Sequence, residues 1–87
     1  MTSFQTAGKR VLLDHDTVVR RLEDVLPEPV REHYVIVQGR RFPPKQVVSL
    51  LTGLDRGDFT THQARRVLKR LGFVAARKRA AGRAGRW

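Results

Sequence analysis

The sequence predicts a small α+β domain, with a helix, a β-hairpin, two further helices and a short strand in that order. Apolar side chains recur at helical spacing in three separate segments. A β-branched segment lies just before a glycine that suits a tight turn. The length of 87 residues leaves room for one domain. The last two helices resemble a helix-turn-helix or winged helix only loosely, because about six to eight residues connect them where three or four are usual.

The first helix is predicted to have Asp14 and Asp16 at its N-terminus and to end near Val25 or Leu26. Aspartates suit a helix N-terminus because they accept hydrogen bonds from its free N–H groups and complement the helix dipole. The apolar stripe that follows them consists of Val18, Val19, Leu22, Val25 and Leu26. Two prolines then stop the helix, since proline lacks an N–H group.

A hairpin and a second helix are predicted next. The segment Tyr34–Val37 is β-branched and aromatic, which is typical of a strand. Gly39 suits the positive φ that a tight hairpin turn requires. The return strand begins at Arg41–Phe42 and is stopped by two prolines, the second of which suits the first position of a helix. We therefore expect a helix over Pro44–Thr52, closed by Gly53.

The third helix shows the most regular pattern. Thr60 or Thr61 is expected to cap it, and Gly72 to end it. Its stripe consists of Ala64, Val67, Leu68 and Leu71. Residues 73–75 are predicted to form a short strand beside the hairpin. The resulting organisation is a flexible N-terminus over residues 1–9, a folded domain over 10–76, and a disordered basic tail over 77–87, where almost nothing apolar is left to bury.

Positive charge is concentrated at one end of the chain. The protein has 18 Lys and Arg against 8 Asp and Glu, a formal net charge of +10 at pH 7. Residues 59–87 hold nine of the basic side chains and none of the acidic ones. A one-signed block attracts polyanions, and each DNA phosphate that it neutralises releases counterions. This favours nucleic acid, duplex DNA above all, over a tail kept for solubility. A membrane surface fits less well, because the tail offers Trp87 as its one bulky apolar anchor.

The third helix is the first candidate for DNA contact. Its apolar stripe leaves two adjacent outer lines of side chains, formed by His62, Gln63, Arg65, Arg66, Lys69 and Arg70. The DNA major groove, about 12 Å wide, admits a helix, and arginine and glutamine suit guanine and adenine edges. Four cations without an anion repel one another at i, i+4 spacing. This favours an anionic partner over an ordinary solvated helix face.

Two more basic elements are predicted to contact phosphates. In the tail, small residues separate Arg77, Lys78, Arg79, Arg83 and Arg86, so that the chain can follow a backbone or enter a minor groove. At the hairpin, Arg40 and Arg41 are placed to grip phosphates as a wing does. Lys45, in the first turn of a helix, suits an anion site, with a plain surface lysine as an equal alternative.

The stretch YVIVQGRRFPPKQVVSLLTGL, followed by DF and ARRVLKRLGF, resembles the N-terminal head domain of McrA-like HNH restriction endonucleases. The matching positions are Tyr34, Gly39–Lys45, Val47–Leu54, Phe59 and Leu71–Phe73. In that family the head precedes modules for modified-base recognition and an HNH nuclease, and the present sequence shows neither. The resemblance implies a DNA-associated setting, in defence or phage biology, without cleavage activity.

No enzyme, metal or cofactor site is predicted. The histidines fall on three different elements, and the sequence contains no cysteine for a disulfide or a thiolate metal site. Asp14 and Asp16 suit capping better than metal binding. Asp55 and Asp58 flank a glycine and suit a turn better than acid–base catalysis. Neither a P-loop nor a dinucleotide motif occurs. We expect no small-molecule substrate.

Two other functions stay open on the sequence. An RNA-binding or ribosome-associated protein would use the tail equally well, although no RNP aromatic motif or GXXG loop occurs. An interaction module of the antitoxin or anti-restriction type would need Phe42, Phe59 and Phe73 at the surface, whereas a small domain normally buries its aromatic residues. The absence of a signal sequence or an apolar span predicts a cytoplasmic protein, and the arginine-rich composition suggests a bacterial, nucleoid-associated one. The sequence leaves a homodimer open.

Overall fold

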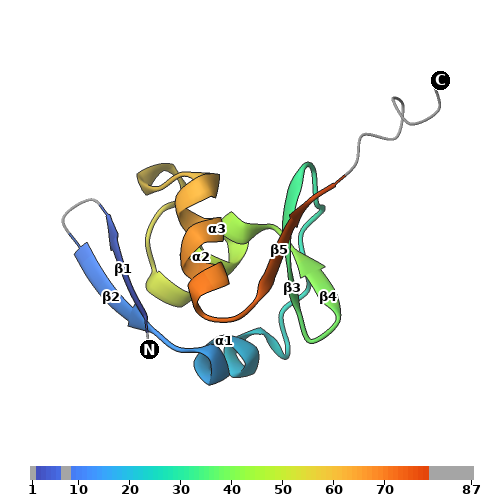
Figure 1. The fold of residues 1–87 in the computed structure, drawn as a ribbon, viewed down its shortest axis with the longest axis horizontal. Helices are drawn as coiled ribbons and strands as arrows, with labels where there is room; N and C mark the ends of the chain where they lie inside the picture. Colours follow the sequence, from blue (N-terminus) through green and yellow to red (C-terminus); the bar gives the residue numbers. More distant parts are fainter. Residues whose placement is uncertain (1, 7–8, 79–87) are drawn as a thin grey trace.

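Three helices and two antiparallel sheets make up residues 2–6 and 9–78, the part of the chain that the computed structural model describes (Figure 1). This is the α+β fold predicted from the sequence. Among these residues, no helix combines the length and the apolar character needed to cross a bilayer. The elements in chain order are β1 (Thr2–Thr6), β2 (Lys9–Leu13), α1 (His15–Leu22), β3 (His33–Val37), β4 (Arg40–Phe42), α2 (Pro44–Thr52), the 3-10 turn η1 (Arg56–Asp58), α3 (Thr61–Arg70) and β5 (Val74–Arg77).

The larger sheet has the strand order β4-β3-β5, with both outer strands antiparallel to β3. Gln38 and Gly39 join β3 to β4 with φ values of 53° and 76°. A tight turn with positive φ at both central residues follows the right-handed twist of the flanking strands, and glycine adopts it at little cost. The predicted hairpin and the predicted third strand are both confirmed.

The core lies between this sheet and the helices. Strand alternation turns Val35, Val37 and Phe42 inward, where all three are fully buried. The apolar stripe of α3 packs against them from the other side, with Leu68 also fully buried. Phe59 and Phe73 are 3% and 8% exposed. The aromatic side chains considered as surface anchors therefore belong to the core, which counts against the interaction-module alternative.

Helix α1 begins as predicted and ends earlier than predicted. The Asp14 carboxylate accepts hydrogen bonds from the Asp16 and Thr17 N–H groups and, at 2.8 Å, from the Thr17 hydroxyl. This bonding lowers the pKa of Asp14, with the Thr17 hydroxyl as the largest cause. The helix ends at Leu22 instead of near Val25 or Leu26. Beyond it the Val25 N–H turns back to the Leu22 carbonyl, and Arg40 binds the same carbonyl.

The N-terminal hairpin was not anticipated. Thr2–Thr6 form a strand paired with β2, where the sequence predicts a flexible segment over residues 1–9. Phe4 is 5% exposed, and its ring meets that of Phe59 edge-on at a centroid distance of 5.6 Å. A single aromatic residue thus anchors an otherwise polar segment to a residue 55 positions away, a contact that local composition does not reveal.

Helix α3 lies between the N-terminal hairpin and β5, and it also packs on α2 (Figure 1). The chain reverses after α3 at Gly72, where φ is 98°, and β5 returns alongside the helix. The last strand therefore ends beside the start of α3. Arg77 pairs with His33 inside the sheet, although it was predicted to begin a disordered tail. The tail residues Arg79, Arg83 and Arg86 lie outside the described residues.

Candidate nucleic-acid interface

The outer face of α3 presents three cations, Arg66, Lys69 and Arg70, which we call the α3 cationic face. All three side chains are exposed. Within the described residues none of them forms an ion pair or a hydrogen bond to another side chain. The acidic residues lie elsewhere, in or beside α1, before β3, and between α2 and α3. The structure thus keeps together three of the four cations that the sequence placed on this helix.

Gln63 has a structural role at the start of α3. The Thr60 hydroxyl accepts a hydrogen bond from the Gln63 N–H at 3.1 Å, and the Gln63 side-chain oxygen accepts one from the Thr60 N–H at 2.8 Å. This reciprocal capping box satisfies two backbone donors that a helix N-terminus leaves free. Reading adenine would need both the oxygen and the nitrogen of the amide. The base contact predicted for Gln63 stays a prediction, and it would have to share the amide oxygen with this capping box.

His62 and Arg65 both lie close to His33 in the sheet. The rings of His62 and His33 are 5.7 Å apart. Arg65 is half-buried, and within the described part of the chain its Nε is buried without a hydrogen-bond partner. Burial and, second, the charge of Arg65 lower the pKa of His33 below its ordinary value of 6.5. The six side chains predicted as two adjacent outer lines thus divide into three groups. Three of them form the α3 cationic face, Gln63 caps the helix, and exposed His62 and half-buried Arg65 lie near His33.

The two hairpin arginines differ from each other. The Arg40 guanidinium donates to the Leu22 carbonyl at 2.6 Å and to the Val25 carbonyl at 2.9 Å. Arg40 therefore caps the end of α1 with two of its five donors, and the phosphate contact predicted for it would have to compete with this role. Arg41 is exposed, with its guanidinium 4.7 Å from the ring centroid of Tyr34, and stays available for a ligand.

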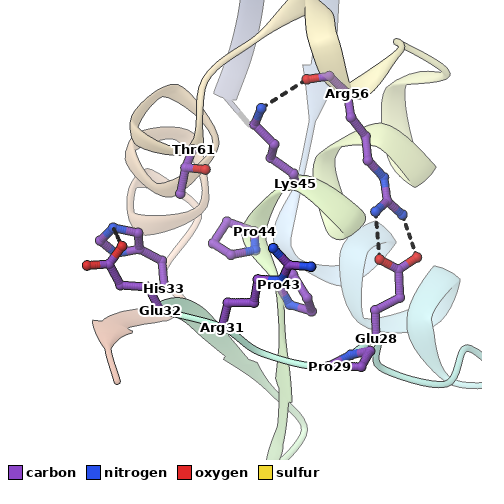
Figure 2. A pocket seen from close by; sticks show the side chains of 10 residues that line it. All are labelled: Glu28, Pro29, Arg31, Glu32, His33, Pro43, Pro44, Lys45, Arg56 and Thr61. Carbon is purple, nitrogen blue, oxygen red and sulfur yellow. Dashed lines mark hydrogen bonds and ion pairs between the residues drawn. The ribbon is translucent and has the colours of Figure 1, made fainter. Parts of the chain in front are cut away.

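Lys45 lies at a groove where α2 and α3 begin (Figure 2). Its Nζ donates to the Arg56 carbonyl at 3.1 Å, and the Arg56 guanidinium forms two hydrogen bonds to the Glu28 carboxylate. This pairing with Arg56 lowers the pKa of Glu28 and raises that of Arg56. The groove includes Arg31 and Thr61, which the sequence analysis overlooked. No local pattern could have found them, because they come together only through the packing of distant segments.

The start of the tail is held at the edge of the sheet. Arg77 pairs with Glu32 at 2.5 Å, and the Lys78 N–H donates to the Glu32 carbonyl. Both side chains are exposed. Among the described residues, no group of three or more His, Asp or Glu side chains has a geometry that would hold a metal ion. Within the described residues, the candidate interface therefore consists of the α3 cationic face, Arg41, and Arg77 with Lys78 at the start of the tail.

A protein-family model described as SCO5918-like matches residues 10–86. The chain belongs to the SCO5918-like family. The match begins within β2, leaves out β1, and runs through β5 into the basic end of the sequence. Comparisons with curated proteins and with solved structures give no significant match. The resemblance to McrA-like head domains stays a prediction.

Proposed function

We propose that this protein binds duplex DNA through the α3 cationic face. The observation that supports this most directly is the combination of exposure and missing partners at Arg66, Lys69 and Arg70. Like charges three and four residues apart on a helix destabilise it by a few tenths of a kcal/mol per pair. DNA phosphates would reverse that cost and release counterions on binding.

The proposed contacts are mainly to phosphates. Arginine and lysine bind phosphate oxygens without regard to sequence, and base reading requires side chains aimed at base edges. The side-chain oxygen of Gln63 is occupied in the capping box. Hairpin β1–β2 and strand β5 flank α3 on its two sides. We therefore infer sequence-tolerant or modestly specific binding, to which Arg41, Lys78 and the basic residues of the tail contribute further charge.

The proposed setting follows from this activity. A DNA-binding protein acts where DNA is, so we place it in the cytoplasm, at the nucleoid, without a catalytic role of its own. The resemblance to McrA-like head domains supports a role in defence or phage biology. Whether the protein acts as a homodimer on paired half-sites is tested by sedimentation with and without DNA.

Fluorescence anisotropy with a labelled duplex of about 20 base pairs tests the proposal. We expect Kd to rise tenfold or more between about 50 and 200 mM salt, because several phosphate contacts are lost together. A structured RNA of equal length serves as a competitor, and it should displace the duplex only weakly. No binding to duplex DNA at the lower salt concentration would refute the proposal, and stronger binding of the RNA would favour the RNA alternative.

A further inference from the structure

The groove beside Lys45 has a volume of about 560 Å³ and lies where the first turns of α2 and α3 meet the start of β3 (Figure 2). Small-molecule sites in proteins span roughly 300–1,000 Å³. Pro29, Pro43 and Pro44 form apolar parts of its wall, and charged or hydroxyl side chains line the rest. The groove therefore has the size and the mixed lining of a ligand site.

The balance of charge around the groove is positive. Its two carboxylates are already paired, Glu28 with Arg56 and Glu32 with Arg77. Arg31 and Lys45 line the groove and form no ion pair within the described residues. The Glu28–Arg56 pair forms one wall and leaves the rest of the groove to the two unpaired cations (Figure 2). An anion entering here would meet cations whose charge is not neutralised by the fold.

Two buried nitrogens of the described residues lack partners, and one of them belongs to a side chain that lines the groove. In the described part of the chain, His33 Nδ1 and Arg65 Nε are buried without hydrogen bonds. The His33 side chain lines the groove and is 18% exposed, and Arg65 is close enough for its charge to act on the His33 ring. Buried polar groups are nearly always hydrogen-bonded, so an unpaired one in a native fold calls for an explanation. The lining of the groove thus includes one side chain, His33, with a nitrogen that the described part of the fold leaves without a hydrogen bond.

The start of α3 adds further donors. The capping box uses the N–H groups of Thr60 and Gln63, which leaves those of Thr61 and His62 without an intrahelical acceptor. Thr61 also lines the groove with its side chain (Figure 2). Ammonium, guanidinium and hydroxyl side chains from separate segments thus line one groove, with the free N–H groups of the first turn of α3 beside them. A tetrahedral anion with several acceptor oxygens suits such a set of donors.

We propose that this groove binds a phosphate group, with Arg31, Lys45 and Thr61 in contact with it. The phosphate belongs to a nucleic-acid strand or to a free nucleotide, whose sugar or base would pack on the prolines. The inference deepens the proposed function and rests on it only for the source of the phosphate. The groove is separate from the α3 cationic face, because it is built around the first turn of α3 and that face lies on the last turns.

The test is an NMR titration of the full chain with inorganic phosphate, with chloride at the same ionic strength as the reference. We expect saturable shifts of the Lys45, Thr61 and His62 amides with phosphate and not with chloride. Lys45→Gln and Arg31→Gln should each weaken phosphate binding about fivefold, the effect of one exposed charge contact. Arg20→Gln removes an exposed charge from α1, outside the groove, and should change nothing. Arg31 is exposed, so we expect Arg31→Gln to keep the fold. If Lys45→Gln unfolds, the phosphate affinity of Arg31→Gln still tests the proposal.

The result that overturns the proposal is the absence of saturable shifts, or equal shifts with chloride. A titration with a 5′-nucleotide and one with a short single strand then separate the two sources of phosphate. If Lys45→Gln weakens the binding of the single strand and the binding of inorganic phosphate by the same factor, the groove is assigned to nucleic acid. Binding of phosphate and nucleotide by a protein that fails to bind duplex DNA would refute the proposed function and leave the groove proposal standing. A protein that binds the duplex and shows no binding of inorganic phosphate would refute the groove proposal and leave the proposed function standing.

Discussion

Arg40 on the hairpin and Arg66 on α3 carry the same side chain in very different surroundings. Arg40 donates to the carbonyls of Leu22 and Val25, and its guanidinium lies 5.0 Å from the Phe42 ring centroid. Arg66 is exposed and shares the α3 cationic face with Lys69 and Arg70, without a partner in the described residues. Net charge alone counts these residues equally. The hydrogen bonds separate the cation that stabilises the fold from those available to a ligand.

The largest expected effect is on stability. Arg40→Ala removes two hydrogen bonds from a charged donor and leaves the part-buried Val25 carbonyl without that donor, so the free energy of unfolding should fall by about 2–3 kcal/mol. Arg41→Ala, at the neighbouring exposed position, should change it by less than about 0.5 kcal/mol. Urea denaturation of both variants measures the difference. Equal effects of the two substitutions would remove the distinction drawn between the hairpin arginines.

The second effect is on DNA binding. Replacing Arg66 and Arg70 together by Ala should raise Kd for duplex DNA about tenfold at low salt and flatten its salt dependence, because about two phosphate contacts are lost. Stability should be unchanged within about 0.5 kcal/mol, since both side chains are exposed. Arg20→Ala on α1 is the charge control. Removing residues 79–87 gives a second comparison, and an effect confined to that truncation would show that the tail binds DNA and α3 does not.

The third effect concerns the start of α3. Thr60→Ala should lower the free energy of unfolding by about 1 kcal/mol, because it removes an N-cap. Gln63→Ala should also destabilise, and the double variant should lose less than the sum, since the two side chains share one capping box. A thermal-denaturation cycle measures this coupling. If Gln63→Ala changes the preferred DNA sequence and leaves stability unchanged, the glutamine reads bases after all.

The smallest effect is a pH dependence at His33. Burial lowers its pKa in the folded protein below the ordinary 6.5, so the unfolded chain takes up a proton at a pH where the folded chain does not. Stability should therefore fall as the pH drops from about 7 toward 5, with the loss beginning near the unfolded pKa. The pKa values of Asp14 and Glu28 are lowered below 3.8 and 4.5, so their stabilising contribution is lost at lower pH.

The variant that isolates this effect is His33→Gln. It should reduce the difference in melting temperature between pH 7.5 and 5.5, because glutamine takes up no proton in that range. The same substitution at exposed His15, on α1, provides the control, because His62 lies against the His33 ring and its charge acts on the pKa of His33. An unchanged pH dependence in His33→Gln, relative to the native chain, would show that the buried histidine does not cause the loss.

Local rules predicted the elements whose signals are contained in a few residues. Helix α2 spans Pro44–Thr52 as expected, because a proline at its first position and a left-handed glycine after its last residue mark both ends. The hairpin turn and the Thr60 cap follow from equally local chemistry. Strand β1 could not be predicted this way, because its anchor is the distant contact between Phe4 and Phe59.

The interface was predictable in part for the same reason. Helical spacing places Arg66 and Arg70 outside the apolar stripe, and the structure keeps them exposed. Helical spacing cannot show that Arg40 reaches the end of α1 or that Arg65 turns toward His33, because both depend on how separate elements pack. The groove at Lys45 joins three segments that lie apart in the sequence, and it becomes visible only in the folded chain.

The most direct test of the α3 cationic face is an NMR titration of the full chain with a short duplex at low salt. We expect the largest amide shifts and line broadening at Arg66, Lys69 and Arg70, with the amide and guanidinium signals of Arg40 unchanged. Perturbations confined to the hairpin or to the tail, with α3 unaffected at saturating DNA, would contradict the account.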